Sequence, residues 1–134
     1  KQWLTQNGDT MPFRVLLPEN YDPSKKYPLV LFLHGRGESG VDNEKQLAHG
    51  AKMFLQDSIR KNYPAIVVFP QCASNSYWSN VQAVTTGNKT GKRTFYFVSE
   101  GEPSQSMKML MGLVRNLLVR YPIKTNQVYV MGLS

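Results

Sequence analysis

The last three residues of the chain, Gly132-Leu133-Ser134, are of types that could carry nucleophilic chemistry. They follow residues 127–131, a run rich in Val and Tyr that is typical of a β-strand. In the pattern G-x-S-x-G a serine sits on a sharp strand-to-helix turn, and the glycines leave room beside the exposed hydroxyl. Only G-x-S is present, and such a triplet also occurs by chance. Ser134 is therefore a candidate nucleophile that needs a second signal.

The second signal is a glycine-rich loop, His34-Gly35-Arg36-Gly37, which directly follows the apolar run at residues 28–33. Acyl transfer places negative charge on the former carbonyl oxygen, and fixed backbone N–H groups can bind that charge. Glycines let such a loop turn so that an N–H points into the site. We expect the Arg36 amide to be this oxyanion-hole donor, with the Gly37 amide as second choice. The other donor is expected to be the amide that follows Ser134.

The two histidines, His34 and His49, are not expected to act as the general base. Where the nucleophile lies on a strand-to-helix turn of this kind, the triad runs Ser, acid, His along the chain. Both histidines precede Ser134. His34 is predicted to brace the glycine-rich loop, and His49 to be a surface or packing residue within a helix. The base that accepts the serine proton, and the Asp or Glu that orients it, are expected beyond residue 134.

The same glycines allow a phosphate-binding interpretation. The stretch Gly35-Arg36-Gly37-Glu38-Ser39-Gly40 formally fits G-x-G-x-x-G. It lacks the Lys-Ser/Thr pair of a P-loop, and no apolar helix begins directly after Gly40. No acidic residue ends a strand about 20 residues further on. The sequence therefore favours the oxyanion loop over a nucleotide site.

The elements that must position these residues alternate along the chain. Continuous apolar runs are typical of strands buried on both faces of a parallel sheet, and apolar residues at helical spacing predict helices. Strands are expected at residues 11–18, 28–33, 65–69 and 127–131, and helices at about 43–61 and 104–121. Residues 94–98 are expected to form an edge strand or a small hairpin. This order predicts an α/β fold with a mostly parallel sheet, right-handed crossovers and helices on both faces.

The second predicted helix carries an apolar stripe that is expected to pack into the core. Its members are Met107, Leu110, Met111, Val114, Leu117, Leu118 and Tyr121. A Met and Leu stripe at this spacing is typical of core packing rather than of a cofactor site.

Composition argues against several other classes. The 134 residues fit one small domain, and no stretch approaches the roughly 18 apolar residues of a membrane span. The net charge is +7, but the basic residues are dispersed, which favours a solvated basic surface over a nucleic-acid or other anionic partner. The single cysteine, Cys72, is expected to be a half-buried thiol rather than a nucleophile or part of a zinc site. No metal and no cofactor are expected. The N-terminus lacks the apolar segment of a signal peptide, and a location outside the cytoplasm after signal removal is preferred.

The run from Met11 to Gly40, MPFRVLLPENYDPSKKYPLVLFLHGRGESG, resembles the opening of bacterial esterases of the phospholipase/carboxylesterase and feruloyl-esterase-like group, which includes predicted peptidases. Further matches are Asp42-Asn43, VFPQC at 68–72, Tyr77-Trp78 and QVYVMGLS at 127–134. The resemblance implies an α/β-hydrolase fold with Ser134 as nucleophile and the loop after His34 as oxyanion loop. It also implies that Trp78 lies near the substrate pocket, with a loop anchor as the equal alternative.

Together these patterns predict that residues 1–134 are the N-terminal part of a single α/β-hydrolase domain, truncated at the nucleophile elbow. We expect the remainder to come from a C-terminal segment or a second chain, and the segment alone not to fold stably. The expected activity is hydrolysis of small-molecule or carbohydrate-linked carboxylic esters through an acyl-enzyme. A serine peptidase of the same fold and a non-catalytic binding module that retains the fold are the alternatives.

Overall fold

The computed structural model describes residues 1–79, 81–86, 92–97 and 101–133 of the chain, and within 81–86 and 92–97 it describes the backbone. A five-stranded sheet has the order β1-β2-β4-β3-β7. β3 is parallel to both β4 and β7, whereas β2 is antiparallel to both β1 and β4. The strands are β1 (Gln2–Gln6), β2 (Asp9–Leu16), β3 (Tyr27–Leu33), β4 (Ile66–Pro70) and β7 (Ile123–Gly132).

The expectation of an α/β fold is confirmed, with a parallel part formed by β4, β3 and β7. The N-terminal hairpin makes the complete sheet mixed. β1 and β2 are joined by a tight turn in which Asn7 has φ 52° and Gly8 has φ 83°. Positive φ at both central residues is the condition for a turn whose twist matches an antiparallel hairpin. β1 has no counterpart among the strands predicted from the sequence.

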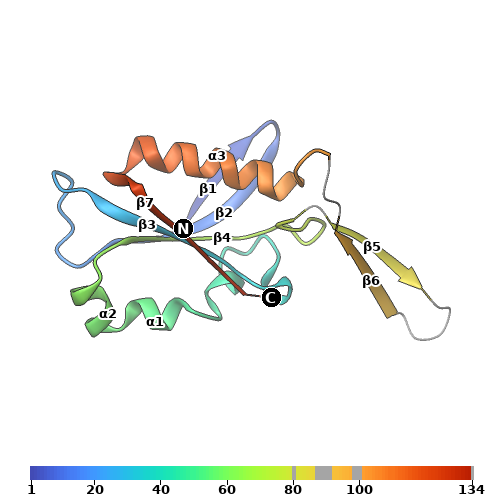
Figure 1. Cartoon of the computed structure of the whole chain (residues 1–134), viewed down its shortest axis with the longest axis horizontal. Helices are drawn as coiled ribbons and strands as arrows, with labels where there is room; N and C mark the ends of the chain where they lie inside the picture. The colour runs from blue at the N-terminus through green and yellow to red at the C-terminus, as the bar shows by residue number, and fades with distance from the viewer. Residues whose placement is uncertain (80, 87–91, 98–100, 134) are drawn as a thin grey trace.

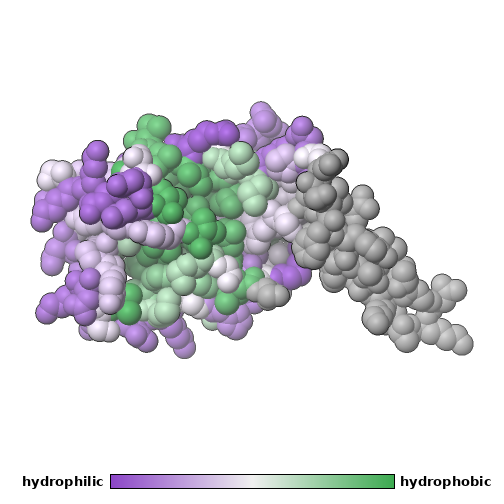
Figure 2. Space-filling view, viewed as in Figure 1, coloured by the Kyte–Doolittle hydropathy of each residue, from purple (hydrophilic) through white to green (hydrophobic). Residues whose placement is uncertain are grey.

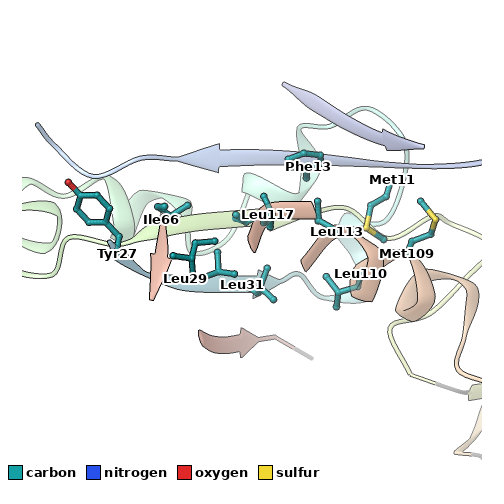
Figure 3. Close-up of a cluster of buried hydrophobic side chains, with 12 residues drawn as sticks. Met11, Phe13, Tyr27, Leu29, Leu31, Ile66, Met109, Leu110, Leu113 and Leu117 are labelled. Atoms are coloured by element: carbon teal, nitrogen blue, oxygen red, sulfur yellow. The ribbon is translucent and has the colours of Figure 1, made fainter. Parts of the chain in front are cut away.

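Helices cover both faces of the sheet, as expected (Figure 1). α3 (Gln105–Arg120) lies on one face, and α1 (Ala51–Leu55) and α2 (Asp57–Asn62) lie on the other. Each face has its own core. On the α3 side, helix residues pack against the sheet in a cluster that includes Phe13, Leu29, Leu113 and Leu117 (Figure 3). On the other side the cluster consists of Phe32, Ala51, Phe54, Val67 and Phe69. β4 lies between these cores, and all five of its residues are buried.

The prediction of a single helix over residues 43–61 is wrong. The structure contains instead a 3₁₀ turn, η2 (Lys45–Leu47), followed by α1 and α2. Gly50 interrupts the helix with φ 88°, a conformation that disfavours side chains, and it lies against the ring of Phe32. Gln56 interrupts it again because its backbone is extended, with ψ 133°. Local helical spacing of apolar residues therefore did not produce one continuous helix.

The helix predicted at residues 104–121 is confirmed as α3. The Ser104 hydroxyl accepts a hydrogen bond from the Met107 amide at 3.1 Å and caps the N-terminus. The predicted apolar stripe is only partly right. Met111 and Leu118 are 44% and 38% exposed, whereas the helix buries Met109, Leu110, Leu113 and Leu117.

The remaining strands, β5 (Val81–Thr86) and β6 (Lys92–Phe97), pair in antiparallel fashion in a separate two-stranded sheet. The hairpin alternative for residues 94–98 is therefore confirmed for the part that the structure describes, which ends at Phe97. This hairpin extends away from the five-stranded sheet (Figure 1).

β7 is the most exposed strand of the five-stranded sheet. Tyr129 and Val130 are 54% and 63% exposed, although both belong to an apolar run. Figure 2 shows a broad apolar area on the face across which β7 runs in Figure 1. Among the described residues, the structure has no helix with the length and hydropathy needed to cross a membrane.

Candidate functional site

The glycine-rich loop begins where β3 ends and forms a short 3₁₀ turn, η1 (Arg36–Glu38). The Gly35 carbonyl accepts a hydrogen bond from the Glu38 amide at 3.2 Å, and the Arg36 carbonyl accepts one from Ser39 at 3.3 Å. The amides of Arg36 and Gly37 form no hydrogen bond to any described residue. The first N–H groups of a helical turn have no partner within it, so these two amides are available to bind an anion.

The end of β7 lies directly beside this loop. Gly132 pairs with Leu33, and the Leu133 amide donates to the Leu33 carbonyl at 3.1 Å. Because β3 and β7 are parallel, their carboxyl ends meet at one edge of the sheet. Ser134 lies outside the described residues. The two sequence signals, residues 132–133 and the loop after β3, are thus adjacent as far as the structure describes them.

His34 is a buried residue with both ring nitrogens hydrogen-bonded. Its Nε2 lies 2.8 Å from the Cys72 amide, which donates to it, so Nε2 carries no proton. Nδ1–H therefore donates to the Gly35 carbonyl at 2.6 Å. Burial, as the largest influence, lowers the pKa of His34 and keeps the imidazole neutral. These contacts join β3, the loop and the segment after β4, as expected for a bracing histidine.

His49 is an exposed residue between η2 and α1. Its Nε2 lies 3.3 Å from a carboxylate oxygen of Glu38. The prediction of a surface residue is confirmed, but the predicted helical position is wrong because Gly50 ends the helical geometry there.

Trp78 contacts the same loop from the segment after β4. Its indole N–H donates to the His34 carbonyl at 3.2 Å, and the two ring centroids are 5.3 Å apart. The ring also packs against the core on the α3 side. This geometry is that of a loop anchor. A role for Trp78 in a substrate pocket stays a prediction.

The Arg36 side chain forms a second connection to that segment, and this connection was not predicted from the sequence. Its guanidinium donates to the Ser76 carbonyl at 2.7 Å and also to the Ser74 carbonyl. It lies over the Tyr77 ring, 4.3 Å from the centroid. The side chain of Arg36 is thus turned to the 74–77 segment and holds the backbone of the loop beside it.

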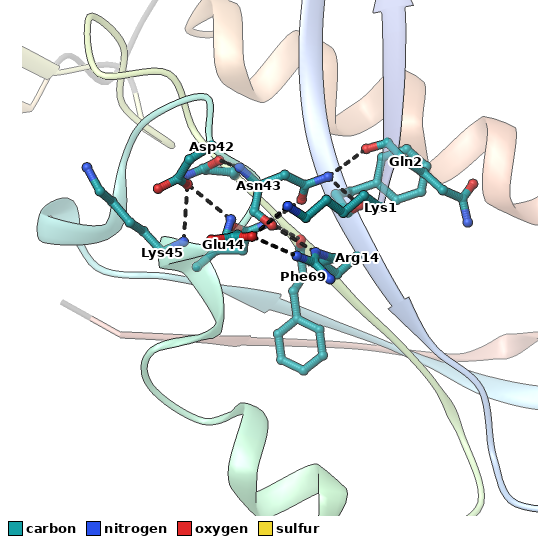
Figure 4. Close-up of polar contacts among 11 residues, drawn as sticks. Lys1, Gln2, Arg14, Asp42, Asn43, Glu44, Lys45 and Phe69 are labelled. Carbon is teal, nitrogen blue, oxygen red and sulfur yellow. Dashed lines mark hydrogen bonds and ion pairs between the residues drawn. The ribbon is translucent and has the colours of Figure 1, made fainter.

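A cluster of three buried amide side chains, Asn43, Gln46 and Gln71, supports the residues that end the loop. Asn43 donates to the carbonyls of Gln2 and Phe13 at 3.1 and 3.2 Å, next to the first two strands (Figure 4). Gln71 is completely buried and joins Asn43 to Glu38. In the sequence, Asp42-Asn43 and VFPQC were noted only as motifs of the family resemblance, without a structural role. The feature of the sequence that could have indicated this cluster is Gln71, a polar residue between an apolar strand and the single Cys of the chain.

Cys72 is fully rather than half buried, at 2% exposure. Its thiol donates to the Ser106 hydroxyl at 3.1 Å, and burial raises its pKa. A buried thiol with a raised pKa is a poor nucleophile, which fits the prediction that Cys72 has a structural role. In the described part of the chain no three His, Cys, Asp or Glu residues gather as a metal site would require.

The formal dinucleotide pattern at residues 35–40 lacks the structure that this pattern needs. The Gly40 amide donates to the Cys72 carbonyl at 2.9 Å, and the next helical residues, η2, begin only at Lys45. A pyrophosphate site of this type requires a helix N-terminus directly after the glycines.

Comparisons with known proteins give three matches. A family described as "Putative esterase" matches residues 5–100 of the chain. A crystal structure of a thermostable esterase superimposes with a TM-score of 0.78 and 32% sequence identity, over 99% of this chain and 33% of the esterase. Dipeptidyl-peptidase 5 of Porphyromonas endodontalis is 45% identical over 42 residues, which are 31% of this chain and 6% of the peptidase. The chain thus spans about a third of the length of the esterase and a small part of the peptidase.

Proposed function

The chain belongs to the "Putative esterase" family of the α/β-hydrolase fold, and from this premise we propose that it supplies the nucleophile and half of the oxyanion hole of a serine hydrolase that cleaves carboxylic esters. The observation that carries the proposal is the hydrogen bond of the Leu133 amide to the Leu33 carbonyl at 3.1 Å. This bond holds the residue before Ser134 against the start of the loop that presents the Arg36 and Gly37 amides.

In the proposed reaction the Ser134 hydroxyl attacks the ester carbonyl carbon. A histidine beyond residue 134, oriented by an Asp or Glu, accepts the hydroxyl proton. The Arg36 amide, or the Gly37 amide as second choice, binds the developing oxyanion together with the amide after Ser134. The tetrahedral intermediate expels the alcohol, which takes the proton from the histidine. Water then hydrolyses the acyl-enzyme by the same steps.

Residues 1–134 are proposed as the N-terminal part of one domain, completed by later sequence that holds the base and the acid. Two facts support this: both histidines of the chain already have other contacts, and the matched esterase is about three times as long. Small-molecule or carbohydrate-linked esters are the proposed substrates, with Trp78 as a candidate wall of the acyl or alcohol pocket.

A serine peptidase is the second candidate, and the similarity to dipeptidyl-peptidase 5 favours it. The two reactions use the same nucleophile and oxyanion hole, and they differ in the leaving group. A dipeptidyl 4-nitroanilide that is cleaved with a higher kcat/KM than any ester by the full-length protein would favour the peptidase.

The proposal is tested in the full-length protein with p-nitrophenyl acetate and a fluorophosphonate probe. We expect turnover of the ester and covalent labelling, and Ser134→Ala should abolish the labelling and lower kcat by about a thousandfold or more. Ser24→Ala is the control, because the Asp22 carboxylate in a surface turn is the only hydrogen-bond partner of the Ser24 hydroxyl among the described residues. Labelling that persists in Ser134→Ala would overturn the assignment of the nucleophile.

A further inference from the structure

Gln71 lies directly after β4, and the sheet fixes its backbone. Its amide donates to the Pro12 carbonyl at 2.9 Å, which extends the pairing of β4 with β2 by one residue. Its side chain is 0% exposed. A buried polar side chain must satisfy its hydrogen bonds within the protein, so its partners reveal what it holds.

The Gln71 side chain uses its acceptor and both of its donors on the glycine-rich loop and the residues that follow. Oε1 accepts from the Asn43 amide at 2.8 Å, and Nε2 donates to the Glu38 carbonyl at 3.0 Å and to Asp42 Oδ1 at 2.9 Å. Glu38 is the last residue of η1, the turn that presents the Arg36 and Gly37 amides. One amide group therefore joins that turn to the end of a central strand.

The loop is shaped closely around this side chain. A Cβ on Gly40 would lie 3.3 Å from Gln71 Nε2, and Gly40 has φ 156°. The hydrogen bond from Gln71 is also the largest influence that lowers the pKa of Asp42, to about 2. Asp42 is thus an ionised acceptor, and hydrogen bonds to ionised groups are stronger than neutral ones.

We propose that Gln71 is a positioning residue for the oxyanion hole, which acts through Glu38 and Asp42 to fix the amides of Arg36 and Gly37. The inference rests on the proposed function for its effect on catalysis. Its structural part, that Gln71 holds the loop, is independent of any activity. Gln71 couples the turn to the rigid sheet. An oxyanion hole is effective because its donors are held in place before the reaction.

The sharpest variant is Gln71→Glu, which keeps the size and one acceptor but replaces the donating group by an oxygen. Above the pKa of the new carboxyl, that oxygen faces the Glu38 carbonyl and the Asp42 carboxylate, and both repel it. Once protonated, it can donate to one of them. Other ionisable groups also lie near this position. Arg14 bonds the Asn43 carbonyl, and His34 and Cys72 meet at the backbone of residue 72. Lys45 and Glu44 lie close to Asp42, and His49 faces the Glu38 carboxylate.

Gln46→Glu is the matched control. Gln46 is equally buried, at 1% exposure, and donates to Asn43 Oδ1 at 2.6 Å in the same cluster. Its only other acceptor in the described part of the chain is the Phe69 carbonyl at 3.4 Å, so it has no hydrogen bond to η1. The control places a carboxyl group in the same cluster without breaking a bond to the turn.

The first readout is kcat and KM for p-nitrophenyl acetate in the full-length protein, between pH 8 and pH 5.5. At pH 8 we expect Gln71→Glu to lower kcat by about tenfold to a hundredfold with little change in KM, because displaced catalytic groups cost rates of this order. The ratio of its kcat to that of the unsubstituted protein should rise as the pH falls. Gln46→Glu should give a ratio that does not depend on pH. A flat ratio for Gln71→Glu, or the same loss in both variants, would overturn the proposal.

The second readout is amide hydrogen exchange in the peptide that covers residues 35–43, which needs no activity. Exchange should accelerate in Gln71→Glu but not in Gln46→Glu. Asp42→Ala provides a variant at an exposed position that preserves the folded core, and it should accelerate exchange by a smaller factor. Unchanged exchange in Gln71→Glu and Asp42→Ala would refute the inference. Failure of the proposed function would show itself differently, as no turnover by the unsubstituted protein.

Discussion

The Cys72 amide donates a hydrogen bond of 2.8 Å to Nε2 of His34. This contact links the end of β3 to the segment after β4, and it exists only while Nε2 is unprotonated. Together with the bond of Nδ1 to the Gly35 carbonyl at 2.6 Å, it sets the orientation of the loop that follows. The protonation state of His34 therefore bears on the geometry of the candidate oxyanion hole.

The first prediction concerns the dependence of stability on pH. The pKa of His34 is lowered from 6.5 in the folded protein, mainly by burial. Below about pH 6.5 the unfolded chain therefore binds a proton that the folded protein does not, and the free energy of unfolding falls as the pH decreases. His34→Asn should reduce the difference in urea midpoint between pH 7 and pH 5. An undiminished difference in His34→Asn would contradict this account.

The second prediction concerns Asp42 at lower pH. Its pKa falls from 3.8 to about 2 in the folded protein, chiefly through the hydrogen bond from Gln71. The stabilisation is present above about pH 4 and is lost as the pH falls towards 2, because the unfolded chain takes up the proton first. Asp42→Asn should flatten this part of the acid unfolding curve, measured by circular dichroism. Gln71→Met should move the loss of stability to higher pH, and no change in either variant would count against the contact.

The third prediction concerns Gly50, which combines an unusual backbone conformation with a close contact. Its φ is 88°, and an added Cβ would lie 2.5 Å from a ring carbon of Phe32. Gly50→Ala should lower the free energy of unfolding by about 2–4 kcal/mol through strain and overpacking. Gly8→Ala is the matched control, because Gly8 has φ 83° and nothing within 4 Å of the added atom. Its cost should be about 1 kcal/mol from backbone strain alone. Chemical denaturation of the two variants decides between the effects, and equal losses would exclude the clash with Phe32.

The fourth prediction concerns Cys72. Its thiol is buried against the Ser106 hydroxyl and its pKa is raised. Cys72→Ser should keep the ester turnover of the full-length protein within about threefold, because the backbone amide that bonds His34 is retained and the hydroxyl can bond Ser106. The native thiol should react slowly with a maleimide and react fully after denaturation. Loss of all turnover in Cys72→Ser would restore the cysteine-nucleophile interpretation.

Predictions from the sequence agree with the structure where neighbouring residues determine an element, and they fail where contacts with distant residues or the backbone conformation decide. β3, β4 and α3 were predicted correctly because the local spacing of their apolar residues and the residues at their ends are typical of such elements. Ser104 and Pro122 flank α3 in this way. The helix at 43–61 was predicted wrongly because the backbone at Gly50 has φ 88° and that at Gln56 is extended, and the spacing of apolar residues does not report either conformation. Met111 and Leu118 fit the helical stripe of α3, but the position of the sheet decides which side of the helix is buried.

For the candidate site, the sequence by itself determined the chemical types: a Gly-x-Ser after a strand, a glycine-rich loop after another, and two histidines that precede the serine. These features are local, since turns and strand ends require particular residues at particular spacings. Only the tertiary structure decided that Leu133 bonds Leu33, that His34 bonds the Cys72 amide and the Trp78 indole bonds the His34 carbonyl, and that Gln71 supports the loop. These contacts join residues from 33 to 100 positions apart, which meet because β7 and β4 flank β3 in the sheet. Strand order depends on how the whole chain packs, because sheet and helices must bury their apolar faces against one another.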